Sequence, residues 1–362
     1  MDLSADAAAG DVAARFSIGG DPIRIARLPG GHINDSFRVS ASAGEFLLQR
    51  LNPHVFPQPG PVMENVARVT RHLAERSRGG PWRTAELVMT REGSDWWTDA
   101  VGGCWRMFPY LVGMTTRERV DTPATAREAA RAFGAFIRLL ADCPARSLHE
   151  TIPGFHDTAR RLTALEEAAR RDACGRAAGA RAEVRAVLEE RAIADVLPPL
   201  AARGEIPVRP VHNDAKIANV LFDARTGAAT CVIDLDTVMP GLALHDFGDM
   251  VRSMASPNDE DETDTRRIEA RPEFIEALAE GFLAEAGSVL TASERRRLVF
   301  AGRLITLEQA ARFLSDHLEG DRYYRTARAG HNLDRARSQI ALYRSLTNQE
   351  PALASLVARL AP

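Results

Sequence analysis

The sequence predicts an α+β protein of two lobes, a small β-rich lobe followed by a larger, mainly helical one. The chain has 362 residues, about twice the length of a common single domain. Short runs of β-type residues alternate with glycine-rich turns over residues 1–110. After Met114, segments rich in Ala, Arg, Glu and Leu take over. We therefore expect an N-terminal lobe at 1–110 and a C-terminal lobe at 111–362.

The N-terminal lobe is predicted to contain several strands and one helix. The helix is expected at Gly60–Arg76, where apolar residues keep helical spacing. Strands are expected in the segments IRIARL, DSFRVSA, GEFLLQRLN, TAELVMTR and GGCWRMFPYLVG.

The C-terminal lobe is predicted to be mostly helical. Helices are expected at Thr122–Cys143, over the stretch Thr158–Leu200, and at Glu294–Leu318. One strand-like patch, Val208–Pro240, interrupts them.

Composition excludes several classes of protein. Hydrophobic residues make up 45% and charged residues 26%, which is typical of a globular chain rather than a disordered one. The net charge of −3 argues against a nucleic-acid-binding protein. The N-terminus lacks the pattern of a signal peptide, and no apolar run is long enough to span a membrane. We therefore expect a cytoplasmic protein without membrane association, and a monomer by default.

The cysteines and the lysine are both informative. Cys104, Cys143, Cys174 and Cys231 lie far apart in sequence without metal-type pairing, so we expect them reduced. Lys216 is the only lysine, and arginine supplies the other 45 basic residues. Because lysine is a compact point charge and arginine a wide planar fork, the single lysine is a candidate for a specific role.

The segment HNDAKIAN, followed by a predicted hairpin, carries the strongest chemical signal. Asp214 precedes Asn219 by five positions, and the hairpin VLF-DARTG-ATCVIDLD delivers Asp234 fifteen residues later. This order matches the protein-kinase template of a catalytic Asp, a metal-binding Asn and a second metal-binding Asp. A polar turn with a helix cap is the alternative interpretation of HNDAKIAN alone.

The template assigns a role to each of these residue types. A phosphoryl acceptor hydroxyl must lose its proton to a carboxylate, here Asp214. Asn219 and Asp234 would supply hard oxygen ligands to the magnesium ion that accompanies ATP. Lys216 would place positive charge near the transferring phosphoryl group.

Two further aspartates need separate interpretation. Asp246 begins the string Asp-Phe-Gly but lies 27 residues after Asn219, so it is predicted to be structural, capping a helix or bracing the catalytic loop. For Asp236, support of the site and direct metal binding both stay open.

The segment PGGHIND near the N-terminus is a candidate nucleotide loop. Gly30 and Gly31 would permit a tight turn whose amides approach phosphate oxygens, with His32 beside them. A plain hairpin turn is the alternative.

Together, PGGHIND, HNDAKIANVLFD, VIDLDTVMPG, DFGD, FLSDHLEGDRYY and HNLDRARSQI resemble the N-acetylhexosamine 1-kinases. These belong to the aminoglycoside phosphotransferase and choline kinase superfamily. The resemblance runs from about Leu28 to Ala341. It implies a bilobal protein-kinase-like fold and transfer of the ATP γ-phosphoryl group to the anomeric hydroxyl of an N-acetylhexosamine.

The resemblance also assigns residues. It implies that Asp214 is the catalytic base and that Asn219 and Asp234 hold magnesium. It implies that His32, Arg312 and Tyr323 contact the sugar. A guanidinium fork such as that of Arg312 suits vicinal hydroxyls and an acetamido oxygen.

The nucleotide site departs from protein kinases. The strand FLLQRLN lacks the usual phosphate-binding lysine, so we expect Arg50 to act there with Glu64 as its partner, or else to face solvent. The hinge is expected at Trp105–Gly113, with Phe108 and Tyr110 near the adenine.

Two other functions stay open. An aminoglycoside, an amino alcohol or another sugar could be the acceptor; a cationic acceptor would need carboxylates, and 258–264 (NDEDETD) is the only acidic run. That run is predicted to be a solvated loop. A nucleotide-binding pseudokinase is disfavoured because the base, both metal ligands and Lys216 are present.

Overall fold

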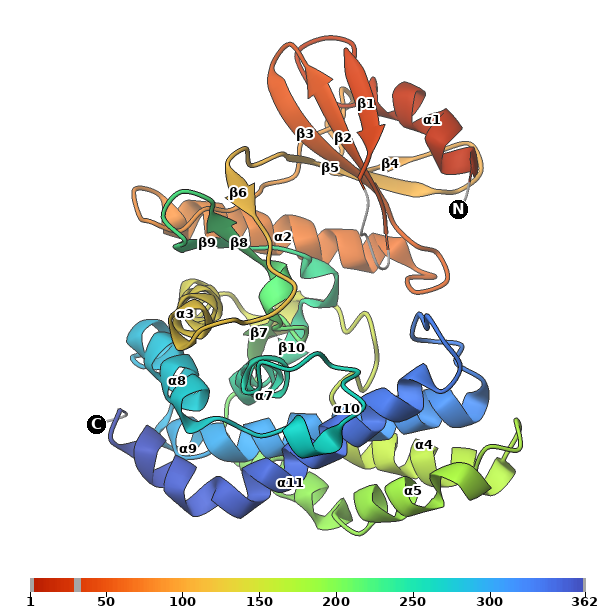
Figure 1. Ribbon diagram of the computed structural model, residues 1–362. Helices are drawn as coiled ribbons and strands as arrows, with labels where there is room; N and C mark the ends of the chain where they lie inside the picture. Colours follow the sequence, from red (N-terminus) through yellow and green to blue (C-terminus); the bar gives the residue numbers. More distant parts are fainter. Residues whose placement is uncertain (1–2, 29–33, 361–362) are drawn as a thin grey trace. The chain divides into compact units, whose positions relative to one another are not determined.

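The computed structural model describes residues 3–28 and 34–360 and confirms the α+β fold class (Figure 1). The chain divides into two compact units. The first, here the N-terminal unit, contains residues up to 115 together with 146–151 and 221–239. The second, here the helical unit, contains 116–145, 152–220 and the residues from 240 onward. His32, Gly30 and Gly31, predicted in the nucleotide loop, lie outside the described residues.

A five-stranded antiparallel sheet is the centre of the N-terminal unit, in the order β1-β2-β3-β5-β4. Its strands are β1 (Arg24–Arg27), β2 (Asp35–Ala41), β3 (Gly44–Arg50), β4 (Trp97–Thr98) and β5 (Cys104–Pro109). Strands were expected at β1, β2, β3 and β5, whereas β4 was not predicted. The strand expected at 84–91 (TAELVMTR) does not form. There the only strand-type pairing among the described residues is a single bridge from Thr90 to Phe16.

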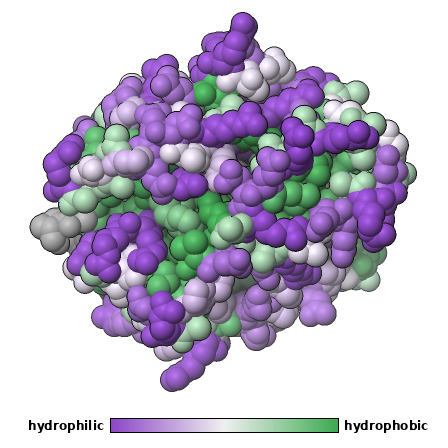
Figure 2. Space-filling model, turned by 90° about the horizontal axis from the view of Figure 1, so that it is seen from below, coloured by the Kyte–Doolittle hydropathy of each residue, from purple (hydrophilic) through white to green (hydrophobic). Residues whose placement is uncertain are grey.

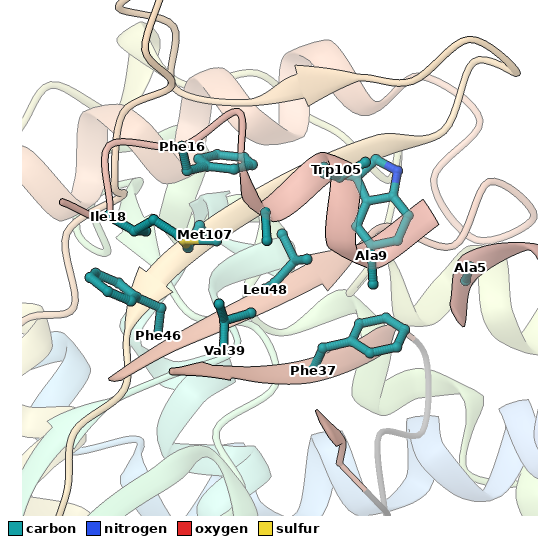
Figure 3. Close-up of a cluster of buried hydrophobic side chains, with 12 residues drawn as sticks. Ala5, Ala9, Phe16, Ile18, Phe37, Val39, Phe46, Leu48, Trp105 and Met107 are labelled. Atoms are coloured by element: carbon teal, nitrogen blue, oxygen red, sulfur yellow. The ribbon is translucent and has the colours of Figure 1, made fainter. Parts of the chain in front are cut away.

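Residue alternation gives this sheet two chemically different faces. Phe37 of β2, Leu48 of β3 and Met107 of β5 point into one apolar core (Figure 3). Helix α1 (Leu3–Ala13), which the sequence analysis did not predict, contributes Ala9 and other small residues to that core. Because side chains alternate along a strand, Gln49 and Arg106 are placed on the opposite face.

The rest of the N-terminal unit carries the predicted hairpin. Strand β6 (Met114–Thr115) pairs with β8 (Val220–Asp223), and β9 (Ala229–Val232) completes a three-stranded sheet in the order β6-β8-β9. Helix α2 (Pro59–Ser77) covers the predicted 60–76 and contacts the 3₁₀ turn Leu235–Thr237. Asn65 of α2 donates hydrogen bonds to the carbonyl oxygens of Val238 (3.0 Å) and His149 (2.8 Å).

The helical unit is built from nine α-helices among its described residues. They are α3 (Pro123–Leu139), α4 (Thr158–Arg171), α5 (Arg181–Leu188), α6 (Pro198–Ala202), α7 (Ala243–Met254), α8 (Pro272–Ala286), α9 (Ala292–Arg295), α10 (Leu298–Glu319) and α11 (His331–Ala358). Helix α10 packs against α4, α7 and α11, and α3 packs against α8. A two-stranded sheet joins β7 (Arg209–Val211) to β10 (Met239–Gly241).

The predicted helical stretch 158–200 is interrupted. Helix α4 ends at Arg171, and its C-cap residue Asp172 has a left-handed backbone (φ 43°). The segment from Cys174 then forms turns and the short 3₁₀ helix Ala178–Ala180 before α5 begins. Glycines at 175 and 179 in this segment have the poor helix propensity that explains the break.

Helices α7 and α10 cross very closely because each has a glycine at the contact. A Cβ on Gly248 of α7 would collide with the carbonyl oxygen of Ala301, and one on Gly302 of α10 would lie 2.6 Å from Cγ1 of Val251. This crossing matters because α7 supports the candidate site.

Surface character agrees with the sequence. Hydrophilic residues predominate on the face shown in Figure 2, with apolar patches between them. Across the described part of the chain, every helix is too short or too polar to span a bilayer.

Candidate active site

The loop His212–Asp214 follows β7 directly and is held from its backbone by α7. Asp246, in the first turn of α7, accepts hydrogen bonds from the backbone N–H groups of His212 (2.8 Å) and Asn213 (2.7 Å). Asn213 has a left-handed backbone (φ 64°), which is uncommon outside glycine and persists where neighbours hold it. The prediction that Asp246 braces the catalytic loop is confirmed by these bonds.

The His212 side chain is a core residue of the helical unit. It is fully buried and packs edge-on against the rings of Phe133 and Phe136 of α3, with centroids 5.4 and 5.7 Å away. Its Nδ1 accepts a hydrogen bond from the backbone N–H of Asp214 (3.3 Å). His212 therefore anchors the turn that presents Asp214.

A buried histidine supports the same loop from its carbonyl side. Nε2 of His156 lies 3.1 Å from the carbonyl oxygen of Asn213, and its Nδ1 lies 2.7 Å from Oε1 of Glu308. Thr158 donates to the other oxygen of Glu308 (2.6 Å). Burial would raise the pKa of Glu308, but the neighbouring His156 and its hydrogen bond lower the pKa to about 2.

Asp214, Lys216 and Asn219 come together at the end of this loop. Nζ of Lys216 lies 2.8 Å from Oδ2 of Asp214, and Nδ2 of Asn219 donates to that same oxygen (2.9 Å) and to the Asp214 carbonyl (2.8 Å). Burial would raise the pKa of Asp214, but the charge and hydrogen bond of Lys216, then His212 and Asn219, lower the pKa to about 2. The carboxylate is therefore ionised throughout the neutral range.

The predicted hairpin delivers Asp234 as an exposed side chain of the N-terminal unit. Asp234 has a left-handed backbone (φ 63°, ψ 57°) and precedes the 3₁₀ turn Leu235–Thr237. Asp236 in that turn is buried and forms an ion pair with Arg106.

An aromatic and arginine cluster lies in the helical unit and includes both residues that the resemblance linked to a sugar. The guanidinium carbon of Arg312 lies 4.9 Å from the ring centroid of Phe155, 5.9 Å from that of Tyr323 and 5.7 Å from that of Tyr324. Burial would lower the pKa of Arg312, but Tyr324, Tyr323, Glu308 and Asp214 together raise it. Arg312 and Asp214 are thus close enough to interact electrostatically.

The turn after α10 presents the two tyrosines. Asp316 accepts hydrogen bonds from the backbone N–H groups of Tyr323 (2.8 Å) and Tyr324 (2.9 Å). Tyr324 is half-buried, packs against Phe313 and accepts a hydrogen bond from Gln309 (3.0 Å), whereas Tyr323 is 60% exposed. Tyr323 is therefore the most exposed aromatic residue of this cluster.

Sequence reasoning missed three members of the cluster. Phe155, Tyr324 and Arg161 were not singled out; Arg161 donates to the carbonyl oxygen of Phe155 through Nη2 (2.9 Å) and Nε (3.3 Å). Burial and the nearby Arg312 lower the pKa of Arg161. The adjacent tyrosines at 323 and 324 were the one available signal, since nothing local connects Phe155 with a helix that begins more than 140 residues later.

The predicted nucleotide residues have separate neighbours. The guanidinium of Arg50 lies over the ring of Trp105 (5.8 Å), whereas the carboxylate of Glu64 lies 2.6 Å from Nε2 of His149. Phe108 lies under Arg106, and Tyr110 lies under Arg38. Their roles toward ATP, including a partnership of Arg50 with Glu64, stay predictions.

Carboxylates of the acidic run 258–264 are paired within the protein. Glu260 binds Arg252 (2.5 Å), and Asp261 lies 3.0 Å from Nε2 of His331. The other three carboxylates also form ion pairs: Asp259 with Arg119, Glu262 with Arg267, and Asp264 with Arg266. The run is thus a partly exposed loop, as we expected, and its carboxylates are paired within the protein.

Comparison with known families identifies the chain. Residues 24–298 match the phosphotransferase enzyme family. The matched part is more than half of the sequence and includes the loop at 212–219. The chain belongs to the phosphotransferase enzyme family. The protein is therefore a small-molecule phosphotransferase, as its Asp-Asn loop predicts.

Solved structures have the same fold as this phosphotransferase. A microcompartment-associated aminopropanol kinase matches with a TM-score of 0.58 at 18% identity, covering 98% of this chain and 99% of its own. An aminoglycoside phosphotransferase from Alicyclobacillus acidocaldarius matches with a TM-score of 0.55 at 14% identity, covering 97% and 95%. A spectinomycin phosphotransferase, solved with ADP and spectinomycin, matches with a TM-score of 0.54 at 12% identity, covering 89% and 93%.

Proposed function

We propose that this phosphotransferase uses ATP and magnesium to phosphorylate the anomeric hydroxyl of an N-acetylhexosamine, giving the sugar 1-phosphate and ADP. The observation that carries the proposal is an ionised Asp214, paired with Lys216, in electrostatic reach of Arg312 and its aromatic neighbours. Asp214 and Lys216 act on the acceptor hydroxyl and on the phosphoryl group that it receives. Arg312 and its aromatic neighbours offer a surface that suits a sugar ring.

Asp214 acts on the acceptor hydroxyl. With a pKa of about 2 it is a weak base, so it first orients the hydroxyl by accepting its hydrogen bond. As the new bond forms between that oxygen and the γ-phosphorus, the bond from phosphorus to the bridging oxygen of ATP breaks, and the hydroxyl proton passes to Asp214. ADP leaves with the electron pair of the broken bond. The ammonium of Lys216 stabilises negative charge on the transferring group.

The residues suited to magnesium have the donor atoms this ion prefers. Asn219 uses its amide nitrogen to bind Asp214, which leaves the Oδ1 oxygen as its cation ligand, and Asp234 offers an exposed carboxylate. Magnesium usually takes only one or two protein oxygens and completes its shell with phosphates and water. When bound, it neutralises the charge on the ATP phosphates.

The charge of the cluster favours a neutral acceptor over a cationic one. Arg161 and Arg312 have no carboxylate within ion-pair distance among the residues the structure describes. The acidic run is already paired with arginine and histidine, so it offers little to an ammonium group. Guanidinium groups instead donate to hydroxyl and acetamido oxygens of an uncharged sugar.

A second candidate keeps the chemistry and changes the acceptor to an amino alcohol or an aminoglycoside. The similarity in fold to an aminopropanol kinase and a spectinomycin phosphotransferase supports it. Their identity to this chain is 18% and 12%, at which level the likeness concerns the fold. The charge argument therefore ranks this candidate second.

The deciding experiment measures magnesium-dependent ADP release over an acceptor panel, with phosphorus NMR of the product. The panel contains N-acetylglucosamine, N-acetylgalactosamine, glucose, galactose, choline, aminopropanol and kanamycin. Arg312→Gln is compared with Arg171→Gln, a matched change at an exposed arginine of α4. We expect turnover with an N-acetylhexosamine, an anomeric phosphate, and a rise in KM for Arg312→Gln alone.

Other results would separate the alternatives. Turnover confined to choline, aminopropanol or kanamycin would replace the sugar with a cationic acceptor. Tight ATP binding without transfer to any member of the panel would contradict the sugar kinase and favour the pseudokinase. The monomeric state, the cytoplasmic location and the absence of nucleic-acid binding stay predictions of the sequence.

A further inference from the structure

The polar face of the N-terminal sheet contains a buried network that ends at the turn after Asp234. Because side chains alternate on β-strands, Ser36 of β2, Gln49 of β3 and Arg106 of β5 lie on the face opposite the apolar core. Gln49 donates to Ser36 (3.1 Å) and accepts from Nε of Arg106 (3.1 Å). The strands thus fix the guanidinium plane of Arg106.

Arg106 makes a two-pronged ion pair with Asp236, 130 residues further along the chain. Nη1 contacts Oδ1, and Nη2 lies 3.1 Å from Oδ2. The two side chains are 2% and 4% exposed. Two parallel hydrogen bonds fix the angle as well as the distance between guanidinium and carboxylate.

Asn34 completes the network. Its Nδ2 donates to Oδ2 of Asp236 (2.7 Å), and its Oδ1 accepts from the backbone N–H of Asn52 (3.0 Å). Both oxygens of Asp236 are therefore engaged by protein donors. The network therefore joins Asn34, Arg106 and the backbone of Asn52 to the turn after Asp234.

General energetics argue for a positioning role. A buried ion pair is often no more stabilising than well-packed apolar residues of the same volume, so stability alone explains it poorly. Asp234, two residues before Asp236, has the left-handed backbone that non-glycine residues keep only where neighbours hold it. The ion pair restrains the turn that immediately follows this conformation.

We propose that Asp236 is a positioning residue, not a metal ligand, and that Arg106 and Asn34 hold it so that Asp234 emerges in the orientation that binds magnesium. This inference rests on the proposed function, because it takes Asp234 as a ligand. It resolves the two roles that the sequence left open for Asp236. Supporting residues of this kind commonly change metal affinity by about 10- to 100-fold.

The test compares Asp236→Asn, Arg106→Gln and the apolar double variant Arg106→Met/Asp236→Leu with Asp234→Asn. Arg209→Gln is the control, because Arg209 also forms a buried ion pair in the helical unit, in which its Nη2 lies 3.0 and 2.9 Å from the two carboxylate oxygens of Glu294. Affinity for Mn²⁺ in the presence of ADP is measured by electron paramagnetic resonance, and unfolding is followed by circular dichroism. The double variant leaves no unpaired buried charge, so it remains interpretable if the single variants unfold.

We expect the three network variants to weaken Mn²⁺ binding by about tenfold or more. Asp234→Asn should abolish it, and Arg209→Gln should lose stability with unchanged affinity. Affinity within twofold of wild type in the folded network variants would overturn the positioning role. Complete loss in Asp236→Asn, equal to that in Asp234→Asn, with retention in Arg106→Gln, would make Asp236 a ligand. Unchanged affinity in Asp234→Asn would refute the metal assignment of the proposed function, and this inference with it.

Discussion

The ammonium Nζ of Lys216 lies 2.8 Å from Oδ2 of Asp214, so the only lysine of the chain pairs with the candidate catalytic carboxylate. The same oxygen accepts a hydrogen bond from Asn219 (2.9 Å). This pairing keeps Asp214 ionised despite its partial burial, and it places a positive charge beside the carboxylate that we propose orients the acceptor.

Replacing Lys216 by Met should move the acid limb of the pH profile. The pKa of Asp214 is held at about 2 against the opposing effect of burial. Without the lysine, burial raises that pKa, and activity that needs the carboxylate is lost at higher pH. We expect the acid limb of kcat/KM to shift upward by at least about one pH unit.

The Lys216→Met measurement covers pH 4 to 8 with the acceptor that the panel identifies. Lys216→Arg serves as the control, because it keeps the charge and should keep the limb near its wild-type position. A lower kcat with an unchanged acid limb of the pH profile would show that Lys216 does not set the pKa of Asp214. Its role would then be to stabilise the phosphoryl group alone.

Glu308→Gln should slow turnover although the side chain is not expected to touch substrate. Glu308 orients His156, which binds the carbonyl oxygen of Asn213 next to Asp214. Loss of that support allows the loop to shift, and a displacement of about 1 Å can cost about 100-fold in rate. We expect kcat to fall by about 10- to 100-fold while the KM for ATP changes little.

The control for this prediction is Glu319→Gln at the end of α10, an exposed carboxylate paired with Arg171. It should leave kcat unchanged. A rise in the KM for ATP with wild-type kcat in Glu308→Gln would contradict a role in positioning the loop.

His245 should make the protein less stable as pH falls below 6.5. Burial, aided by the nearby His156, lowers the pKa of His245 from 6.5 to about 3. Between these values the unfolded chain binds a proton that the native state does not, so acid favours unfolding. The free energy of unfolding can fall by up to about 1.4 kcal/mol for each pH unit in this range.

His245→Phe should reduce this dependence, measured as the melting temperature between pH 5 and 8. Asp214 and Glu308 each have a pKa lowered to about 2. Their contributions to the free energy of unfolding are therefore lost only below this pH range and do not interfere with the measurement. Burial also lowers the pKa of His317, so the melting temperature of both proteins should still depend somewhat on pH. Identical slopes in wild type and variant would show that His245 is not the responsible group.

Gly248→Ala should destabilise the helical unit. The added Cβ would collide with the carbonyl oxygen of Ala301 and lie 2.6 Å from Cγ1 of Ile305. Overpacking of this kind costs about 1–3 kcal/mol, and each kcal/mol lowers the melting temperature by about 2–4 °C. Gly60→Ala in α2, with nothing within 4 Å of its added Cβ, should cause no loss. Equal melting temperatures would show that α7 and α10 can separate at little cost.

The sequence predicted the fold class and the catalytic loop because both depend on local patterns. Periodicity of two or 3.6 residues marks most strands and helices, and the spacing from Asp214 to Asn219 is set by one tight loop. Helix α1 was missed because its alanine-rich segment has a weak amphipathic pattern. The interruption of 158–200 was missed although its glycines were visible.

By itself the sequence determined which residues can do chemistry: a carboxylate, an amide and a lysine within six positions, and a second carboxylate after a hairpin. Only the tertiary structure decided which residues support them. Asp236 pairs with Arg106 across 130 positions, and His156 meets Glu308 across 152. The physical reason is that partners for buried charges are chosen by the packing of distant elements, about which residue type and local spacing carry no information.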